Sequence, residues 1–159
     1  MDSPAPSSTP TLGSSRTTPL LIGIAVVLRD GGSRILIRQR PLVHGSPMPG
    51  IWEFPGGKTD PGEDPSQTAV RECLEESGLA VTIPNATLNN QGFAAPLHRV
   101  THQYPHGPVD LHYYECCCLD DPDSFDPESG FRWIPVADLN KYRFPSANEA
   151  IIEKLQSRF

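Results

Sequence analysis

Three glutamates, Glu72, Glu75 and Glu76, lie close together near the middle of the 159-residue chain. On a helix, Glu75 and Glu76 would project within about 60° of Glu72 on either side, so the three carboxylates would share one face. Carboxylates gathered in this way repel one another unless a divalent cation neutralises them. Mg²⁺ in particular binds a few carboxylates together with the phosphate oxygens of a substrate. The cluster is therefore either a solvated acidic helix face or a metal site for a phosphorylated substrate.

The element that must position these glutamates is a helix predicted over 65–77. Asp64 is suited to the N-cap, Pro65 to the first helical position, and Gln67 completes a capping box with Asp64. Gly78 is predicted to end the helix, because glycine readily adopts the left-handed conformation of a C-terminal cap. The face opposite the glutamates is predicted to pack on the core and consists of Val70, Cys73, Leu74 and Ser77.

The stretch GKTDPGEDPSQTAVRECLEESGL, which runs from Gly57 to Leu79, resembles the Nudix box. This box is the signature of a superfamily of hydrolases that act on nucleoside diphosphates linked to a further group. The spacing matches, since five residues separate Gly57 from Glu63 and seven separate Glu63 from Arg71. The sequence departs from the family at Cys73, where an aliphatic residue is usual. On the apolar face of the helix this cysteine can serve as a small hydrophobe.

The resemblance implies a role for each charged residue of the box. Glu72, Glu75 and Glu76 match the family's ligands for a divalent metal, which would be Mg²⁺ or alternatively Mn²⁺. Glu72 or a neighbouring glutamate matches the general base. Arg71 matches an arginine that orients a glutamate through an ion pair, which completes the predicted catalytic set. The backbone carbonyl of Gly57 is implied as a further metal ligand.

An acidic loop predicted over 120–130 offers one more metal ligand. Glu128 approximately matches such an acid in the family, although its spacing to the following tryptophan differs. Asp123 or Asp126 could take this role instead, and a solvated acidic loop is the alternative. Within the box, Glu63 matches a glutamate that is structural or lies near the metal.

Two segments outside the helix resemble the MutT-like branch of the family, which hydrolyses oxidised guanine nucleotides, chiefly 8-oxo-dGTP. One is Trp52–Lys58 (WEFPGGK), and the other is Phe144–Glu149 (FPSANE), in which an asparagine, here Asn148, reads the oxidised purine. An asparagine amide offers both a donor and an acceptor, so it can pair with two atoms of a base edge. The alternative is that Asn148 merely begins a helix beside a Ser146 cap.

Three further residues are predicted to bind the substrate. Arg40 matches an arginine that contacts nucleotide in this branch, with a surface arginine as the alternative. Phe54 is expected to line the base pocket or to pack in the core. Lys58 follows the glycines of the WEFPGGK segment.

These features predict a Mg²⁺-dependent nucleoside triphosphate pyrophosphohydrolase that converts 8-oxo-dGTP to 8-oxo-dGMP and pyrophosphate and so cleans the nucleotide pool. A second hypothesis keeps the chemistry and changes the substrate to CTP or a modified pyrimidine nucleotide, because 91–118 resembles such relatives as well. A third is a sensor that binds nucleotide without turnover. A reader of 8-oxoguanine in DNA is disfavoured, because such domains have lost the glutamates and this chain is acidic.

Composition bounds the domain organisation and the partners. With 159 residues, the chain is predicted to form one domain over 19–159 after a disordered tail over 1–18 that is rich in Ser, Thr and Pro. The net charge of −6 argues against binding to a nucleic acid polymer. The longest apolar run, 20–28, is too short to span a membrane. We expect a cytoplasmic monomer or homodimer with reduced cysteines.

The fold is predicted to be α+β, a Nudix-type α/β/α sandwich with a mixed β-sheet between helices. A turn is expected at 30–32. A terminal helix is predicted over 147–158, with Ser146 and Glu149 as its capping box. The predicted strands are 20–28, 34–40, 52–54, 80–83, 93–104, 109–118 and 131–134.

Overall fold

The computed structural model describes residues 18–42, 48–84 and 87–158. The predicted tail, apart from Thr18, lies outside these residues. The strands are β1 (Leu20–Arg29), β2 (Arg34–Gln39), β3 (Trp52–Glu53), β4 (Gly56–Lys58), β5 (Val81–Thr82), β6 (His98–Tyr104), β7 (Gly107–Cys118) and β8 (Phe131–Pro135). The α-helices are α1 (Pro65–Ser77) and α2 (Glu149–Gln156), and the 3₁₀ turns are η2 (Asp30–Gly32), η3 (Val136–Lys141) and η4 (Ser146–Asn148). Among the described residues, no helix has the length and apolar character needed to cross a membrane.

The strands form one mixed sheet built around β1. β1 pairs in parallel with β7, from Leu20 opposite Val109 to Leu28 opposite Cys117, and it pairs antiparallel with β2 and β4. β3 and β8 pair with β2, and β5 and β6 pair with β7. Because β1 has partners on both edges and is covered on both faces, 24–28 is buried, as the apolar run predicts.

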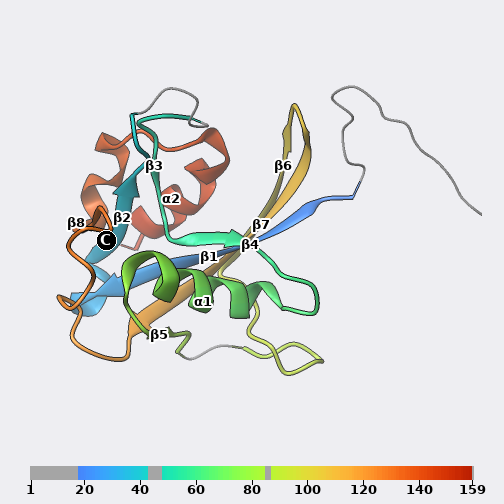
Figure 1. Ribbon diagram of the computed structural model, residues 1–159, viewed down its shortest axis with the longest axis horizontal. Helices are drawn as coiled ribbons and strands as arrows, with labels where there is room; N and C mark the ends of the chain where they lie inside the picture. Colours follow the sequence, from blue (N-terminus) through green and yellow to red (C-terminus); the bar gives the residue numbers. More distant parts are fainter. Residues whose placement is uncertain (1–17, 43–47, 85–86, 159) are drawn as a thin grey trace, which may run out of the picture.

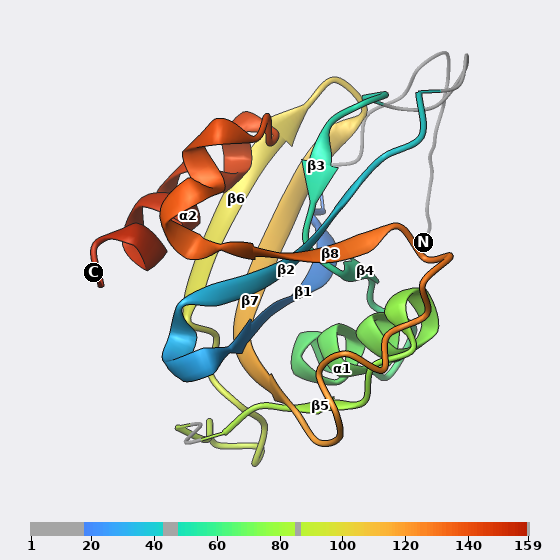
Figure 2. The ribbon, with the colours of Figure 1, turned by 90° about the vertical axis from the view of Figure 1, so that its left-hand side faces the viewer.

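Helices cover both faces of this sheet. Figure 1 and Figure 2 show α1 on one face and the helical turns around α2 on the other. Alternate residues of β1 point to the two sides, so that Val27 packs in the core under α1 and Val26 packs in the core under α2. The four cysteines are free thiols, and Cys73 and Cys116 are buried in the core under α1. The predicted α/β/α sandwich with a mixed sheet is confirmed.

Helix α1 has the predicted bounds and caps. The side chain of Asp64 accepts from the N–H of Ser66 (3.0 Å), and the N–H of Asp64 donates to Oε1 of Gln67 (2.9 Å). Gly78 ends the helix with a φ of 82°. These local signals fix which residues of the box face which way.

The face of α1 that packs on the sheet consists mainly of small residues, namely Ser66, Thr68, Ala69, Cys73 and Ser77. They allow a close approach to β1 at Gly23, where an added Cβ would lie only 2.2 Å from the carbonyl oxygen of Pro65. Leu74 does not belong to this face, and its side chain is 51 % exposed. The predicted core position of Leu74 is therefore wrong.

The C-terminal helix begins later than predicted. The turn η4 is closed by the N–H of Asn148 on the carbonyl of Pro145 (2.9 Å), and α2 starts at Glu149. The predicted capping box of Ser146 with Glu149 is wrong, because within the described chain no side chain caps this end of α2. Asn148 occupies the N-cap position, but its Oδ1 accepts from the hydroxyl of Tyr113 instead.

Strand β6 begins at His98, whereas a strand was expected from 93 onward. The residues before it fold back on themselves, since the N–H of Asn89 donates to the carbonyl of Phe93 (2.7 Å) and the N–H of Ala95 donates to the carbonyl of Thr87 (2.7 Å). The hairpin of β6 and β7 is therefore shorter at this end than the predicted strand over 93–104.

Candidate active site

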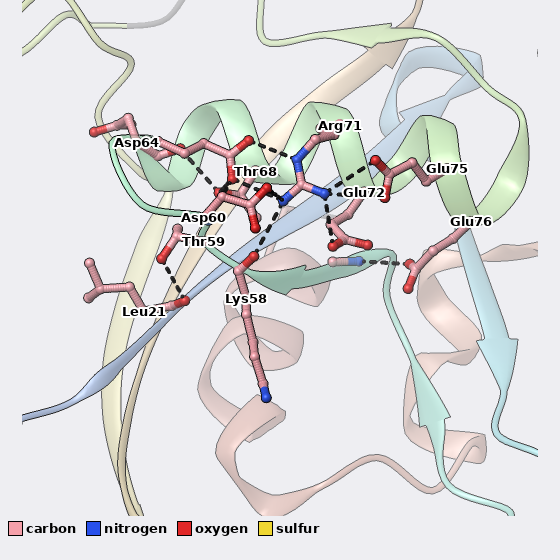
Figure 3. A network of polar contacts seen from close by, with 12 residues as sticks. Leu21, Lys58, Thr59, Asp60, Asp64, Thr68, Arg71, Glu72, Glu75 and Glu76 are labelled. Atoms are coloured by element: carbon pink, nitrogen blue, oxygen red, sulfur yellow. Dashed lines mark hydrogen bonds and ion pairs between the residues drawn. The ribbon is translucent and has the colours of Figure 1, made fainter. Parts of the chain in front are cut away.

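Arg71 is the centre of a polar network along α1, which Figure 3 shows. Its Nε and Nη2 donate to the two carboxylate oxygens of Glu63 (2.8 and 2.9 Å), a bidentate pair. Its Nη1 donates to Glu72 and to Glu75, each at 3.2 Å. Arg71 thus makes the ion pairs with glutamates that the sequence predicts, and it holds Glu72 and Glu75 on one side of the helix.

Glu63 fixes the position of Arg71. Glu63 also accepts from the hydroxyl of Thr68 (2.7 Å) and from the N–H of Asp60 (3.0 Å). The hydrogen bonds from Arg71 lower the pKa of Glu63 to about 2, against the opposing effect of burial. Glu63 is therefore a charged partner of Arg71 at neutral pH.

Glu63→Gln is expected to destabilise the fold by about 1–3 kcal/mol at neutral pH, the usual value for hydrogen bonds to charged groups. A carboxyl with a lowered folded pKa stabilises the fold above its unfolded pKa, and this contribution disappears as the pH falls toward the folded value of about 2. The difference in unfolding free energy between parent and variant should therefore shrink from about pH 5 downward. Urea unfolding followed by circular dichroism measures it. A difference that stays constant down to acid pH would contradict the lowered pKa.

Glu76 and Glu72 lie against the glycines of β4. The N–H of Gly56 donates to Oε1 of Glu76 (3.1 Å), and the guanidinium of Arg38 lies 3.4 Å from its other oxygen. Burial raises the pKa of Glu76 to about 7 and also raises the pKa of Glu72. A Cβ on Gly57 would lie 2.6 Å from Oε2 of Glu72. Glycine at this position is what allows a glutamate of α1 to reach the backbone of β4.

The oxygen donors between α1 and the glycines of β4 fit a hard cation. Carboxylates of Glu72, Glu75 and Glu76 and the carbonyl of Gly57 are oxygen ligands of the kind that Mg²⁺ takes. Burial and neighbouring negative charge disfavour the ionised forms of Glu72 and Glu76, and a cation would favour them. Within the described ranges, no three acidic, histidine or cysteine side chains already enclose an ion-sized space. The guanidinium of Arg71 bridges Glu72 and Glu75 instead.

A cavity of about 500 Å³ opens beside β4, and the tip of the β6–β7 hairpin contributes to its wall. All four residues predicted to bind substrate line it together with the predicted backbone ligand: Arg40, Phe54, Gly57, Lys58 and Asn148. The cavity wall also includes Gly56, whose N–H donates to Glu76 of α1, so the wall that contains Asn148 extends to a residue bonded to one of the glutamates.

The predicted substrate residues differ in how they are held. Arg40 donates from Nε to Glu53 (2.8 Å). Phe54 is buried and its ring stacks on Phe144 with centroids 4.9 Å apart, so that it both packs in the core and lines the cavity. Lys58 is exposed, and Figure 3 shows its side chain extending away from the Arg71 network.

The structure does not join Glu128 to these residues. Its side chain is exposed and has no polar partner within the described residues, although its N–H donates to Asp126 (2.9 Å). The N–H of Asp126 donates to the carbonyl of Ser77 (2.7 Å), which ties the acidic loop to the end of α1. Asp123 pairs with Arg29 (2.7 Å). A role for Glu128 in metal binding stays a prediction.

Among the other residues of the cavity wall are three with polar side chains to which the sequence alone assigns no role, namely Glu53, Tyr104 and His106. Glu53 lies opposite Arg38 in the register of β2 and β3, and it accepts from Arg38 and Arg40. Tyr104 and His106 lie at the hairpin tip with their rings stacked 5.8 Å apart. The register of a β2–β3 hairpin could have revealed Glu53, whereas nothing local marks the hairpin tip as part of a site.

Both the sequence and the fold of this chain are similar to those of known proteins. A family model described as NUDIX domain matches residues 24–154. Over 90 residues the chain is 39 % identical to an 8-oxo-dGTP diphosphatase of Proteus vulgaris, an alignment that covers 57 % of this chain and 70 % of that protein. Over 103 residues it is 34 % identical to a CTP pyrophosphohydrolase of Escherichia coli (strain K12), with coverage of 62 % and 73 %. The fold is similar to the crystal structure of a MutT protein from Methanosarcina mazei Go1, with a TM-score of 0.67 and 17 % identity over 91 % of this chain and 98 % of that one.

Proposed function

The chain belongs to the NUDIX domain family and is a MutT-like Nudix hydrolase, and we propose that it converts 8-oxo-dGTP to 8-oxo-dGMP and pyrophosphate. Members of the family act on nucleotide anhydrides. One observation carries the choice of substrate: the wall of a single cavity includes Asn148 and also Gly57, which is so close to Glu72 of α1 that an added Cβ would lie 2.6 Å from the carboxylate. A nucleotide can therefore place its base at Asn148 and its phosphates at the glutamates.

The glutamates of α1 and the backbone of β4 would hold the metal that binds the phosphates, and one glutamate would activate water. Glu72, Glu75, Glu76 and the carbonyl of Gly57 would hold Mg²⁺ or Mn²⁺, which when bound polarises the phosphates and neutralises the charge of the departing pyrophosphate. Glu72 is the general base of this proposal, since its carboxylate can accept a proton of the attacking water. The water oxygen bonds to phosphorus as the bond to the leaving pyrophosphate breaks.

Positive charge is available on both sides of these glutamates. Arg71 is held mainly by Glu63, so Glu72 and Glu75 can change partners without releasing it. Lys58 and Arg40 bring positive charge to the cavity wall, where the phosphates of a nucleotide would lie. These side chains bind and orient the substrate, while the chemistry takes place at the carboxylates.

Pyrophosphate release from a panel of nucleotides, measured with Mg²⁺ and again with EDTA, tests the proposal. The panel contains 8-oxo-dGTP, dGTP, CTP, a modified dCTP and ADP-ribose. A kcat/KM that is highest for 8-oxo-dGTP and is abolished by EDTA is the expected result. A preference for a cytidine nucleotide would replace the base assignment with the second candidate, which the similarity to a CTP pyrophosphohydrolase favours. Tight nucleotide binding without turnover would make the protein a sensor.

Asn148→Ala is expected to lower the preference for 8-oxo-dGTP over dGTP by about tenfold, because a good contact to a base edge provides about 1–3 kcal/mol of discrimination. The ratio of the two kcat/KM values from steady-state kinetics measures this. Asn140→Ala, in an exposed position on η3, is the matched control and should leave the ratio as it is. An unchanged ratio in the Asn148 variant would remove this residue from base recognition.

A further inference from the structure

We propose that Tyr113 sets the orientation of the Asn148 amide, so that the cavity selects bases that present a keto oxygen to it rather than an amino group. This inference rests on the proposed function, because it concerns how a base is read in the same cavity. Tyr113 itself is not part of the cavity wall. It is a positioning residue that acts through Asn148.

Tyr113 holds a fixed position behind the cavity. It lies on β7, on the face of the sheet that α2 covers, and its side chain is fully buried. The ring of Phe54 stands edge-on to it with centroids 6.4 Å apart, and the ring of His98 lies 5.8 Å away. From this position its hydroxyl donates to Oδ1 of Asn148, which is itself only 8 % exposed.

The phenol keeps its proton, and that proton needs an acceptor. Burial raises the pKa of Tyr113 above its usual range, so the group stays neutral under ordinary assay conditions. Its hydrogen bond goes to Oδ1 of Asn148. Turning the amide over would place Nδ2 against the phenol and take this acceptor away. A buried donor without a partner is unfavourable, so the contact favours one amide orientation.

The orientation decides what Asn148 can offer to a ligand. With Oδ1 on the side of Tyr113, the Nδ2 group lies on the opposite side of the amide, and its N–H bonds meet no acceptor among the described residues. They can donate to a keto oxygen, such as that at C6 of guanine or hypoxanthine. An amino group, such as that at C6 of adenine or C4 of cytosine, would set donor against donor.

The nucleotides dITP and dATP are the sharpest probes, because their bases differ only in the keto or amino group at C6 and the adjoining N1 proton. We expect the parent protein to prefer dITP. Tyr113→Phe keeps the ring and removes the hydroxyl, so the amide becomes free to turn and to accept from the amino group. The dITP-to-dATP ratio of kcat/KM should then fall by about tenfold, the discrimination typical of one base-edge contact.

Tyr114→Phe is the matched control. Tyr114 is the next residue of β7 and is also buried, but it packs in the core under α1 on the other face of the sheet. Its variant should keep the parent ratio. A double-mutant cycle gives the second control: in an Asn148→Ala background, Tyr113→Phe should no longer change the ratio. An unchanged ratio in Tyr113→Phe, or a change that persists without Asn148, would overturn the inference.

Asn148→Asp tests the same idea with Tyr113 intact. The carboxylate still accepts from Tyr113 but presents a second acceptor to the cavity, so the preference should reverse toward dATP, and a retained preference for dITP would contradict the inference. The results also distinguish a failure of the proposed function from a failure of the role of Tyr113. A parent protein that hydrolyses no purine nucleotide ends the proposed function, whereas a parent that prefers dITP with variants that keep this ratio ends only the role of Tyr113.

Discussion

Glu76→Gln is expected to lower kcat for 8-oxo-dGTP by about 10²–10⁴-fold while the protein stays folded, because the charge stabilisation that a metal site provides is worth several kcal/mol. The substitution keeps the shape of the side chain and an oxygen that can accept from the N–H of Gly56 (3.1 Å). It removes one negative charge from the predicted metal site between α1 and β4. Pyrophosphate release at saturating nucleotide measures the loss.

Thermal unfolding separates a lost site from a lost fold in this variant. The folded pKa of Glu76 is raised to about 7, so the carboxyl favours the folded state at low pH and this contribution is lost as the pH rises through 7. Glutamine does not ionise. The Tm of the variant should therefore equal or exceed that of the parent at about pH 8. Glu149→Gln, exposed on α2, is the control and should turn over normally. Near-normal turnover in Glu76→Gln would overturn its assignment to the metal site.

Gly23→Ala is expected to destabilise the fold by about 3 kcal/mol or more, at the upper end of what overpacking costs. The added Cβ would lie 2.2 Å from the carbonyl oxygen of Pro65 and 2.8 Å from the Cβ of Thr68. A backbone oxygen cannot turn aside as a side chain can, so α1 would have to move away from β1. Chemical denaturation measures the loss in unfolding free energy.

Gly57→Ala is the contrasting variant. Here the added Cβ meets the end of a flexible side chain, Oε2 of Glu72 at 2.6 Å. Because this glutamate can swing away, we expect an unfolding free energy close to that of the parent together with a clear loss of turnover. If Gly23→Ala unfolded at the same denaturant concentration as the parent, the close packing of α1 on β1 would be wrong.

Helix α1 could be predicted to the residue because its determinants are local. Asp64, Pro65 and Gly78 act within one turn of the helix ends, through hydrogen bonds and backbone preferences of neighbouring residues. The same holds for the shared face of Glu72 and Glu75, which follows from helical spacing, and the structure joins both to one guanidinium.

The features that escaped prediction depend on contacts between distant segments. Ser146 could cap a helix in isolation, but in the structure it begins the turn η4, and Asn148 of this turn accepts a hydrogen bond from Tyr113, 35 residues away. The exposure of Leu74 depends on which face of α1 packs on the sheet. Glu53 is placed in the cavity wall by strand register. Residue patterns along the chain do not reveal the contacts of Ser146 and Leu74, and Glu53 could be found only by assigning the register of β2 and β3.

The parallel pairing of β1 with β7 also sets the order in which the protein can assemble. β1 leaves the ribosome long before its partner, because Leu20 pairs with Val109. Contacts so far apart in the chain form slowly, since closing the loop between them is entropically unfavourable. Until β7 arrives, the apolar residues of β1 have an unpaired edge, which is the kind of surface that aggregates. Helix α1 packs on β1, so the glutamates of α1 reach their final positions only late in folding. We expect a nascent chain that stalls before β7 is made to bind chaperones and to be inactive.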